Sequence, residues 1–300
     1  MRILVTGASG FIGSNLVRAF RSLDWDVTII TRSKTRLNFQ ELSSAKLLVK
    51  IYDGNLDSLY QAFEVGIPDL VVHLSSMYLS EHKPDDIAEM MAANIVFPTK
   101  LLETMNHFGV QRLINTGTSW QNYRDNNYCP VNLYAASKQA FESIANYYVD
   151  SCKIKIVTLK LFDTYGPGDN RPKLFTLLRR SLLDGTELEM SPGEQLIDLV
   201  YVDDVVNAYL CAVNLFHEEF SHQSYAVGAS ERVTLRELVE IYQNIVGRKI
   251  SIKWGSRPYR TREVMVPWNS SDKLPQWSPK IELIEGISNM EISNGIIDRI

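Results

Sequence analysis

Short apolar runs rich in β-branched residues alternate with longer amphipathic stretches through the first half of this 300-residue chain. The runs are apolar throughout, which is typical of strands buried on both faces. The intervening stretches place apolar residues at helical spacing, as Leu16, Ala19 and Phe20 do. This alternation predicts an α/β fold with a doubly wound parallel sheet, because helices that connect parallel strands cover both of its faces. The expected strands are Ile3–Thr6, Val27–Ile30, Leu47–Ile51, Leu70–Leu74, Leu113–Asn115 and Ile156–Leu159, and the longest expected helices are Asp85–His107 and Leu133–Ser151.

The pattern changes after Tyr165, where Gly166–Asn170 has the composition of a turn. A looser mixture of helices, short strands and prolines follows it. We therefore expect a first domain over residues 1–165 and a smaller C-terminal lobe over 166–300, with the chain returning to the first domain around 202–228. The elements expected beyond the boundary are helices Val202–Val213 and Leu235–Val246 and a strand at Ser251–Trp254.

Three glycines, Gly7, Gly10 and Gly13, lie between the first expected strand and the first expected helix. In this context the first glycine permits a sharp turn, the second lets the backbone approach a pyrophosphate, and the third lets the helix pack closely on the strand. The free N–H groups of the helix N-terminus attract phosphate. The first domain is thus predicted to bind a dinucleotide, with contacts from Phe11 and Ile12 at the helix start and from Leu74 after the fourth strand.

The end of the second strand discriminates between the two nicotinamide dinucleotides. NAD binding normally uses an acidic residue there, whereas NADP needs a basic residue for its 2′-phosphate. The strand ends in Thr31 and Arg32 with no carboxylate, which favours NADP(H). The alternative is that Arg32 is a solvated surface charge. Asp53, after the third strand, either bonds the adenine or is an ordinary loop aspartate.

Tyr134 and Lys138 are four residues apart in an expected helix, so both side chains lie on one face of it. An ammonium beside a phenol favours the phenolate. The pair is therefore a candidate for exchanging a proton with a substrate oxygen while a cofactor carries hydride.

Hydroxyl groups follow the fifth expected strand, at Thr118 and Ser119. Ligands of open parallel sheets gather at the carboxyl ends of the strands. A hydroxyl there can donate to a substrate carbonyl oxygen and stabilise the charge that develops on it. The alternative is that both residues cap a turn.

These residues, together with Tyr165–Asp169 and Tyr201–Val205, resemble the extended short-chain dehydrogenase/reductase family, and more narrowly its NAD(P)-dependent nucleotide-sugar epimerases, dehydratases and reductases. The resemblance covers essentially the whole chain. It implies a Rossmann first domain and a nucleotide-sugar-binding lobe. It also implies catalysis by Thr118, Tyr134 and Lys138, in which Lys138 lowers the phenol pKa and anchors the cofactor ribose.

Departures from the family pattern indicate the reaction. Ser119 and Trp120 stand where 4,6-dehydratases carry an Asp-Glu pair, which disfavours dehydration. Thr31 stands where 4-epimerases commonly have Asp. The resemblance therefore implies NADPH-dependent reduction of a nucleotide-diphosphate 4-keto-6-deoxyhexose, dTDP- or CDP-linked, in deoxysugar biosynthesis for O-antigen or lipopolysaccharide. The alternatives are an NAD-dependent nucleotide-sugar 4-epimerase and a non-catalytic NADP sensor.

The resemblance also implies the substrate contacts. Asp163 stands where family members often have Asn at the substrate diphosphate, and Arg260 is similar to an arginine that reaches this group from the C-terminal region. Lys173 and Arg171 are placed to assist. The alternative is that these cations belong to a solvated basic loop. Thr118 and Ser119 complete the expected substrate site.

The charge balance is weakly acidic, with 31 Lys and Arg against 35 Asp and Glu. A net charge of -4 argues against a protein that coats nucleic acid or an anionic membrane. The three cysteines show no disulfide or zinc spacing, so we expect no metal site and a reducing compartment. With no long apolar span, the sequence predicts a cytoplasmic protein, and an apolar helix such as Leu133–Val149 suggests a homodimer.

Overall fold

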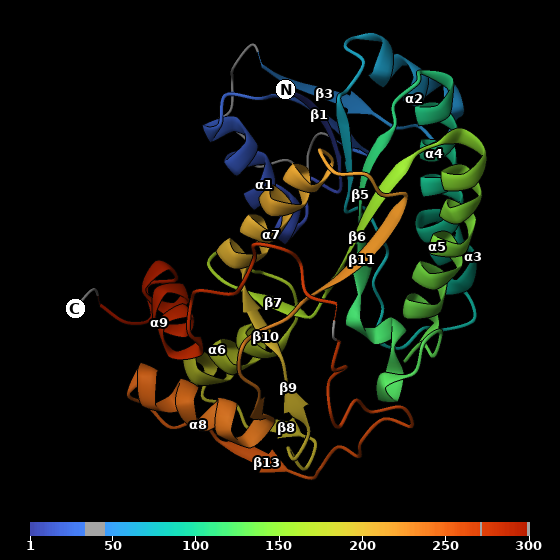
Figure 1. Ribbon diagram of the computed structural model, residues 1–300. Helices are drawn as coiled ribbons and strands as arrows, with labels where there is room; N and C mark the ends of the chain where they lie inside the picture. The colour runs from blue at the N-terminus through green and yellow to red at the C-terminus, as the bar shows by residue number, and fades with distance from the viewer. Residues whose placement is uncertain (34–45, 271, 299–300) are drawn as a thin grey trace.

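A computed structural model describes residues 1–33, 46–270 and 272–298, and its centre is a seven-stranded sheet (Figure 1). Every neighbouring pair in this sheet is parallel. The order is β11-β6-β5-β4-β1-β2-β3, so the chain first builds outward from β1 to β3 and then from β4 to β11 on the other side. This confirms the expected doubly wound parallel fold. The strands of this sheet are β1 Arg2–Thr6, β2 Asp26–Thr31, β3 Leu47–Ile51, β4 Leu70–His73, β5 Arg112–Thr118, β6 Lys155–Leu161 and β11 His222–Val227.

Helices cover both faces of the sheet, with α1 and α7 on one side and α4 and α5 on the other (Figure 1). The alternation of side chains along β1 decides which core each residue joins, so Ile3 and Val5 pack against α1 and α7 while Leu4 faces the opposite layer. The helices of these two layers are α1 Phe11–Ser22, α2 Leu56–Glu64, α3 Asp86–Met91, α4 Phe97–His107, α5 Leu133–Cys152 and α7 Val202–Leu215.

The long helix predicted over Asp85–His107 is confirmed, and it contains a π-helical segment, Ala92–Val96, between α3 and α4. The buried side chain of Asn94 lies in that segment and bonds the backbone N–H and carbonyl of Met77, at 2.7 and 3.0 Å. It also donates to Ser137 Oγ at 2.9 Å. The extra residue of the π turn therefore directs an amide toward two other segments, which apolar periodicity does not reveal.

A second lobe has its own core, centred on Tyr165, Phe175, Leu238 and Tyr242. It lies at the carboxyl ends of the central strands, beneath the sheet in Figure 1. Three two-stranded pairs join its segments: β7 with β10, β9 with β12, and β8 with β13. Its elements are β7 Asp163–Tyr165, α6 Leu174–Asp184, β8 Leu188–Met190, β9 Leu196–Ile197, β10 Leu199–Tyr201, β12 Val233–Thr234, α8 Leu235–Val246, β13 Ile252–Trp254 and α9 Leu283–Ser293.

The chain returns from this lobe to the central sheet through α7 and β11. β11 pairs along β6 from His222 opposite Ile156 to Val227 opposite Leu161. β11 is absent from the strands expected from sequence. The domain boundary at residue 165 stays a prediction, because β7 on one side of it bonds β10 on the other.

Candidate active site

The glycine-rich turn is folded so tightly that two of its glycines have no room for a side chain. Gly7 has a φ of +74°, and a Cβ there would lie 2.6 Å from the backbone nitrogen of Ser75. A Cβ on Gly13 would lie 2.2 Å from the carbonyl oxygen of Gly7. Gly10 is less restricted, with the same oxygen at 3.2 Å. The end of β4, where Leu74 donates to the Thr6 carbonyl at 3.2 Å, thus packs directly on this turn.

The turn leads into an α1 N-terminus that fits a pyrophosphate. Its N-cap is Gly10, and within the described residues no side chain caps the first N–H groups. The first turn begins with Phe11 and Ile12 and carries no acidic residue. Backbone donors and the positive end of a helix dipole therefore face outward beside a close-packed glycine turn, which is the arrangement that holds the phosphates of a dinucleotide.

The residues expected to select the dinucleotide lie at the surface. Arg32 pairs with Glu89 at 3.5 Å, and the two side chains are 69% and 64% exposed. Thr31 Oγ1 donates to the Ser33 carbonyl at 3.0 Å. The Asp53 carboxylate accepts a hydrogen bond from the backbone N–H of Asn55 at 2.9 Å, so it caps a turn whether or not it also bonds adenine. Lys34, a further basic residue of this segment, lies outside the described residues.

Thr118 and Ser119 end β5 and begin a short 3-10 helix, Ser119–Gln121. Thr118 Oγ1 accepts from the Trp120 N–H at 3.3 Å, so the hydroxyl does cap this turn. The bond uses a lone pair and leaves the hydroxyl proton available to a ligand. The capping role and the proposed catalytic role are therefore compatible.

α5 carries Tyr134 and Lys138, and polar contacts fix its first turn. Its N-cap, Asn132, accepts from the Ala135 N–H at 2.9 Å and donates to the carbonyls of Leu79 and Ser80. One turn later, Ser137 Oγ receives the Asn94 amide and donates to the Tyr134 carbonyl at 2.7 Å. The loop after β4 and the start of α5 are thus held together.

A buried network that sequence reasoning missed connects β5 to α5. Gln121 is fully buried; its Oε1 accepts from the Thr118 N–H at 2.9 Å, and its Nε2 donates to Glu142 Oε1 at 2.8 Å. Glu142 lies one helical turn beyond Lys138. A single amide therefore sets the position of the Thr118 backbone relative to the helix that carries the tyrosine and the lysine.

Burial shifts the pKa values of both α5 residues. Burial raises the pKa of Tyr134 to about 12, although a hydrogen bond with Ser76 acts against it. The net shift of the phenol pKa is upward because loss of solvent around a phenolate outweighs the groups that lower it, and the expected lowering by Lys138 stays a prediction. Burial also lowers the pKa of Lys138 to about 8, opposed by the charge of Glu142.

A cavity of about 870 Å³ separates this centre from the second lobe. Ser119, Asp163, Lys173 and Arg260 line it, so the structure brings these four expected substrate-site residues together, whereas Thr118 and Arg171 are outside the lining.

Tyr78 and Trp120 also line the cavity and were missed from the sequence. The Tyr78 ring contacts that of Tyr134 edge-on, with 5.0 Å between the ring centroids, and its centroid lies 5.9 Å from that of Trp120. Tyr134 itself is outside the lining, but its ring packs against that of Tyr78, which is part of the lining.

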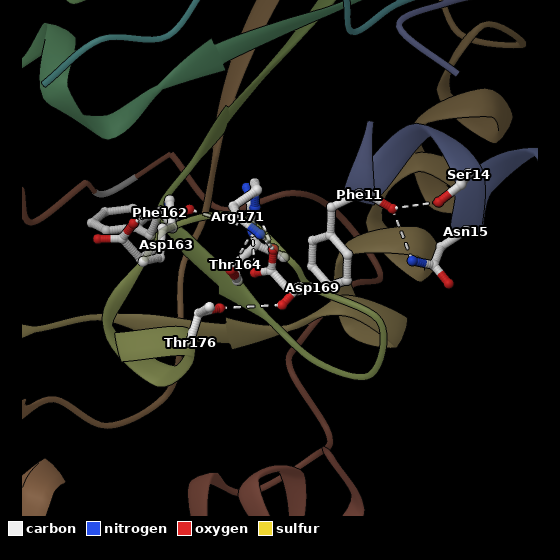
Figure 2. Close-up of polar contacts among 10 residues, drawn as sticks. Phe11, Ser14, Asn15, Phe162, Asp163, Thr164, Asp169, Arg171 and Thr176 are labelled. Carbon is white, nitrogen blue, oxygen red and sulfur yellow. Dashed lines mark hydrogen bonds and ion pairs between the residues drawn. The ribbon is translucent and has the colours of Figure 1, made fainter. Parts of the chain in front are cut away.

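Arg171 links the second lobe to the glycine-rich turn (Figure 2). Its guanidinium donates to both carboxylate oxygens of Asp169 at 2.7 Å and to the Thr164 carbonyl at 2.8 Å. The same group lies 4.7 Å from the ring centroid of Phe11, the first residue of α1. A cation–π contact thus joins the dinucleotide turn to the wall of the cavity.

Among residues 1–33, 46–270 and 272–298, no helix is long and apolar enough to cross a membrane. The same residues contain no cluster of three or more His, Cys, Asp or Glu side chains arranged to hold a metal ion.

Known proteins are similar to this chain in sequence and in fold. The chain is 29% identical over 294 residues to CDP-abequose synthase of Salmonella typhimurium, with 96% of each chain covered. Its structure is similar to UDP-glucose 4-epimerase from Thermotoga maritima with UDP-glucose, with a TM-score of 0.86 and 24% identity over 98% of this chain and 99% of that one. It is also similar to UDP-glucose 4-epimerase of Thermus thermophilus with NAD, with a TM-score of 0.83 and 25% identity over 99% and 100% of the two chains. A model of the NAD dependent epimerase/dehydratase family matches residues 3–228, and the chain belongs to that family.

Proposed function

We propose that this protein reduces the 4-keto group of a nucleotide-diphosphate 4-keto-6-deoxyhexose, with NADPH as the reductant. The observation that carries the proposal is a cavity of about 870 Å³, a volume in the range of pockets that hold small molecules, whose lining includes Ser119, the residue after Thr118, and Tyr78, whose ring contacts that of Tyr134. The glycine-rich turn is joined to the cavity wall through the contact between Phe11 and Arg171, which bonds Thr164 and Asp169 of the lining.

Thr118, Tyr134 and Lys138 have separate roles in the proposed reaction. When bound, NADPH supplies the hydride that is transferred to C4. The free proton of the Thr118 hydroxyl donates to the keto oxygen and stabilises its developing charge. Tyr134, which burial keeps protonated with a pKa of about 12, gives the proton that completes the alcohol. Lys138 is mainly cationic at pH 7, with a pKa of about 8, and anchors the ribose.

The walls near Tyr134 support a 6-deoxy sugar. Tyr78 and Trp120 present aromatic surface there, and the carboxylate of Asp163 is close enough to raise the pKa of both Tyr134 and Tyr78. A methyl group at C6 suits aromatic surface, whereas Asp163 would repel a C6 carboxylate. The name of the Salmonella relative further supports CDP as the nucleotide. Lys173, which pairs with Asp163, and Arg260 are the cations of the cavity lining proposed to bind the diphosphate.

The reaction is tested by following NADPH oxidation with CDP-, dTDP-, GDP- and UDP-linked 4-keto-6-deoxyhexoses. We expect the fastest turnover with the CDP- or dTDP-linked substrates, and an alcohol at C4 in the product by NMR. Absence of NADPH oxidation with all four substrates would contradict the proposal.

NADP is proposed over NAD because β2 ends at Thr31 and is followed by Arg32, with no carboxylate at either position. The Arg32–Glu89 pair is largely exposed and therefore weak enough to exchange for a 2′-phosphate. Tighter binding of NADPH than of NADH in a fluorescence titration would support this choice, and the difference should shrink in Arg32→Ala. Tighter binding of NADH by the unsubstituted protein would contradict it.

The second candidate is a nucleotide-sugar 4-epimerase, favoured by the similarity to the two UDP-glucose 4-epimerases. Such an enzyme returns the hydride to the same sugar and keeps its NAD. Mass spectrometry of nucleotide released by acid from purified protein distinguishes the two. Stoichiometric NAD would favour the epimerase, whereas exchangeable NADP supports the reductase.

A further inference from the structure

The two cations that face the cavity each have a carboxylate of the same chain as partner. Lys173 Nζ lies 2.7 Å from Asp163 Oδ1, and Arg260 Nε lies 3.5 Å from Glu81 Oε1. All four residues line the cavity. An incoming diphosphate therefore meets cations that are already neutralised, not free ones.

Asp163 is the more strongly held of the two carboxylates. Burial alone would raise its pKa, but the charges of Lys173, Arg171 and Arg260 together lower it, so the side chain is an anion at neutral pH. Yet the side chain is 42% exposed and that of Lys173 is 29% exposed. This anion is thus surrounded by cations and still accessible from the cavity.

Arg171 differs from these two cations in the number of groups that hold it in place. It donates to two oxygens of Asp169 and one carbonyl, and its face is covered by Phe11. Lys173 forms one ion pair and lies 5.5 Å from the Tyr78 ring centroid, and Arg260 forms one ion pair whose side chains, Arg260 and Glu81, are 48% and 75% exposed. Exposed single pairs contribute little stability and exchange readily, so Lys173 and Arg260 are available to a ligand in a way that Arg171 is not.

We propose that Asp163 and Glu81 compete internally with the diphosphate of the substrate, which binds by displacing them from Lys173 and Arg260. This inference rests on the proposed function to the extent that the cavity holds a nucleoside diphosphate. The competition keeps the unliganded cavity close to neutral, and it weakens binding of substrate and product alike, since each carboxylate repels the diphosphate after exchange. Asp163 therefore sets affinity for the nucleotide and assists its release.

Calorimetric titration with CDP, in the presence of saturating dinucleotide, tests the competition without requiring turnover. Asp163→Asn keeps the size of the side chain and removes its charge. We expect CDP to bind Asp163→Asn about tenfold more tightly, because one like charge beside the phosphates is gone. The CDP affinity of Asp163→Asn should also fall more steeply with added NaCl than that of the wild type, because the neighbouring carboxylate no longer offsets the charge of the cations.

Asp150→Asn is the matched control. It removes the same charge from an exposed position 16 residues beyond Tyr134 on α5, or about 24 Å along the helix, and should leave the affinity for CDP unchanged. Glu81→Gln provides an independent second variant at an exposed side chain, with tightening of about threefold expected because its pair with Arg260 is weaker.

The results separate this inference from the function on which it rests. If wild-type protein and both variants bind CDP equally, or if Asp163→Asn binds it more weakly, Asp163 is no competitor and the inference is overturned while nucleotide binding stands. If CDP, dTDP and UDP all fail to bind any of the proteins, the proposed function is overturned, and the competition with it. Tightening in both variants but not in Asp150→Asn supports the inference even if no 4-keto sugar is reduced.

Discussion

The two halves of the site are built in different ways. The dinucleotide turn is a single contiguous segment in which backbone atoms approach so closely that a Cβ on Gly13 would lie 2.2 Å from the Gly7 oxygen. The substrate cavity gathers side chains from the loop after β4, the end of β5, the segment around β7 and the loop that contains Arg260. The turn depends on the absence of side chains, whereas the cavity depends on the charge and aromatic surface of side chains from distant segments. Substitutions should therefore act on the two halves by different routes.

The largest effect is expected at Tyr134, whose ring packs against the cavity-lining Tyr78. Tyr134→Phe removes the proposed proton donor and should lower kcat by about 1000-fold, within the range for loss of a general acid. Dinucleotide affinity should stay within about twofold, because the glycine-rich turn is untouched. Stopped-flow NADPH oxidation and a fluorescence titration measure the two quantities. Near-normal turnover would assign the proton to another group.

Gly13→Ala tests the turn by filling space that the backbone occupies. The new Cβ forces the Gly7 carbonyl to move, which should weaken dinucleotide binding about 100-fold and destabilise the fold by about 1–3 kcal/mol. Thermal unfolding and dinucleotide titration report both effects. The matched control is Gly66→Ala, whose Cβ would meet nothing closer than an Arg2 side-chain carbon at 4.0 Å. Equal losses in the two variants would contradict the close-packed turn.

Gln121→Leu tests the buried connection between β5 and α5. It leaves the Thr118 N–H and the Glu142 carboxylate without their partner, so kcat should fall about tenfold while the KM for the dinucleotide is unchanged. Gln139→Leu removes another contact of Gln121 but leaves Thr118 anchored, and should have little effect. A lower melting temperature with normal kcat would show that Gln121 stabilises the fold without positioning the site.

The smallest effect concerns pH. Burial lowers the pKa of Lys138 to about 8, so its ammonium is present below that pH and lost above it. The ratio kcat/KM for the dinucleotide, which reports on the free enzyme, should fall to about half at that pH and decline further above it. In Lys138→Met, kcat/KM for the dinucleotide should be lower at neutral pH and should not decline near pH 8. If kcat/KM instead declines near pH 10, or still declines near pH 8 in Lys138→Met, another group is responsible for the titration.

Features encoded in contiguous sequence were predicted well. The alternation of strands and helices indicated the parallel sheet, and the Leu47–Ile51 strand and the Leu235–Val246 helix agree with β3 and α8. Features that depend on distant contacts were missed. The π turn is explained by Asn94 bonding to Met77 and Ser137, and nothing in local periodicity indicates either partner.

The cavity shows the same limit. Asp163 and Lys173 were both expected at the substrate site, but sequence gives no distance between two side chains and so did not indicate that they form an ion pair. Tyr78 and Trp120 are ordinary aromatic residues until the fold places both rings near Tyr134. The roles of the individual site residues stay predictions.

The place of β11 in the sheet has a consequence for synthesis on the ribosome. β6 ends at Leu161, but its outer neighbour is not complete until Val227, so the whole segment between them must emerge first. During that interval the apolar edge of β6 is open to pairing with other chains. The pairing also spans 66 residues, since His222 lies opposite Ile156, and contacts this distant slow folding. A nascent chain stalled before β11 should therefore be the form most prone to aggregate and most in need of a chaperone.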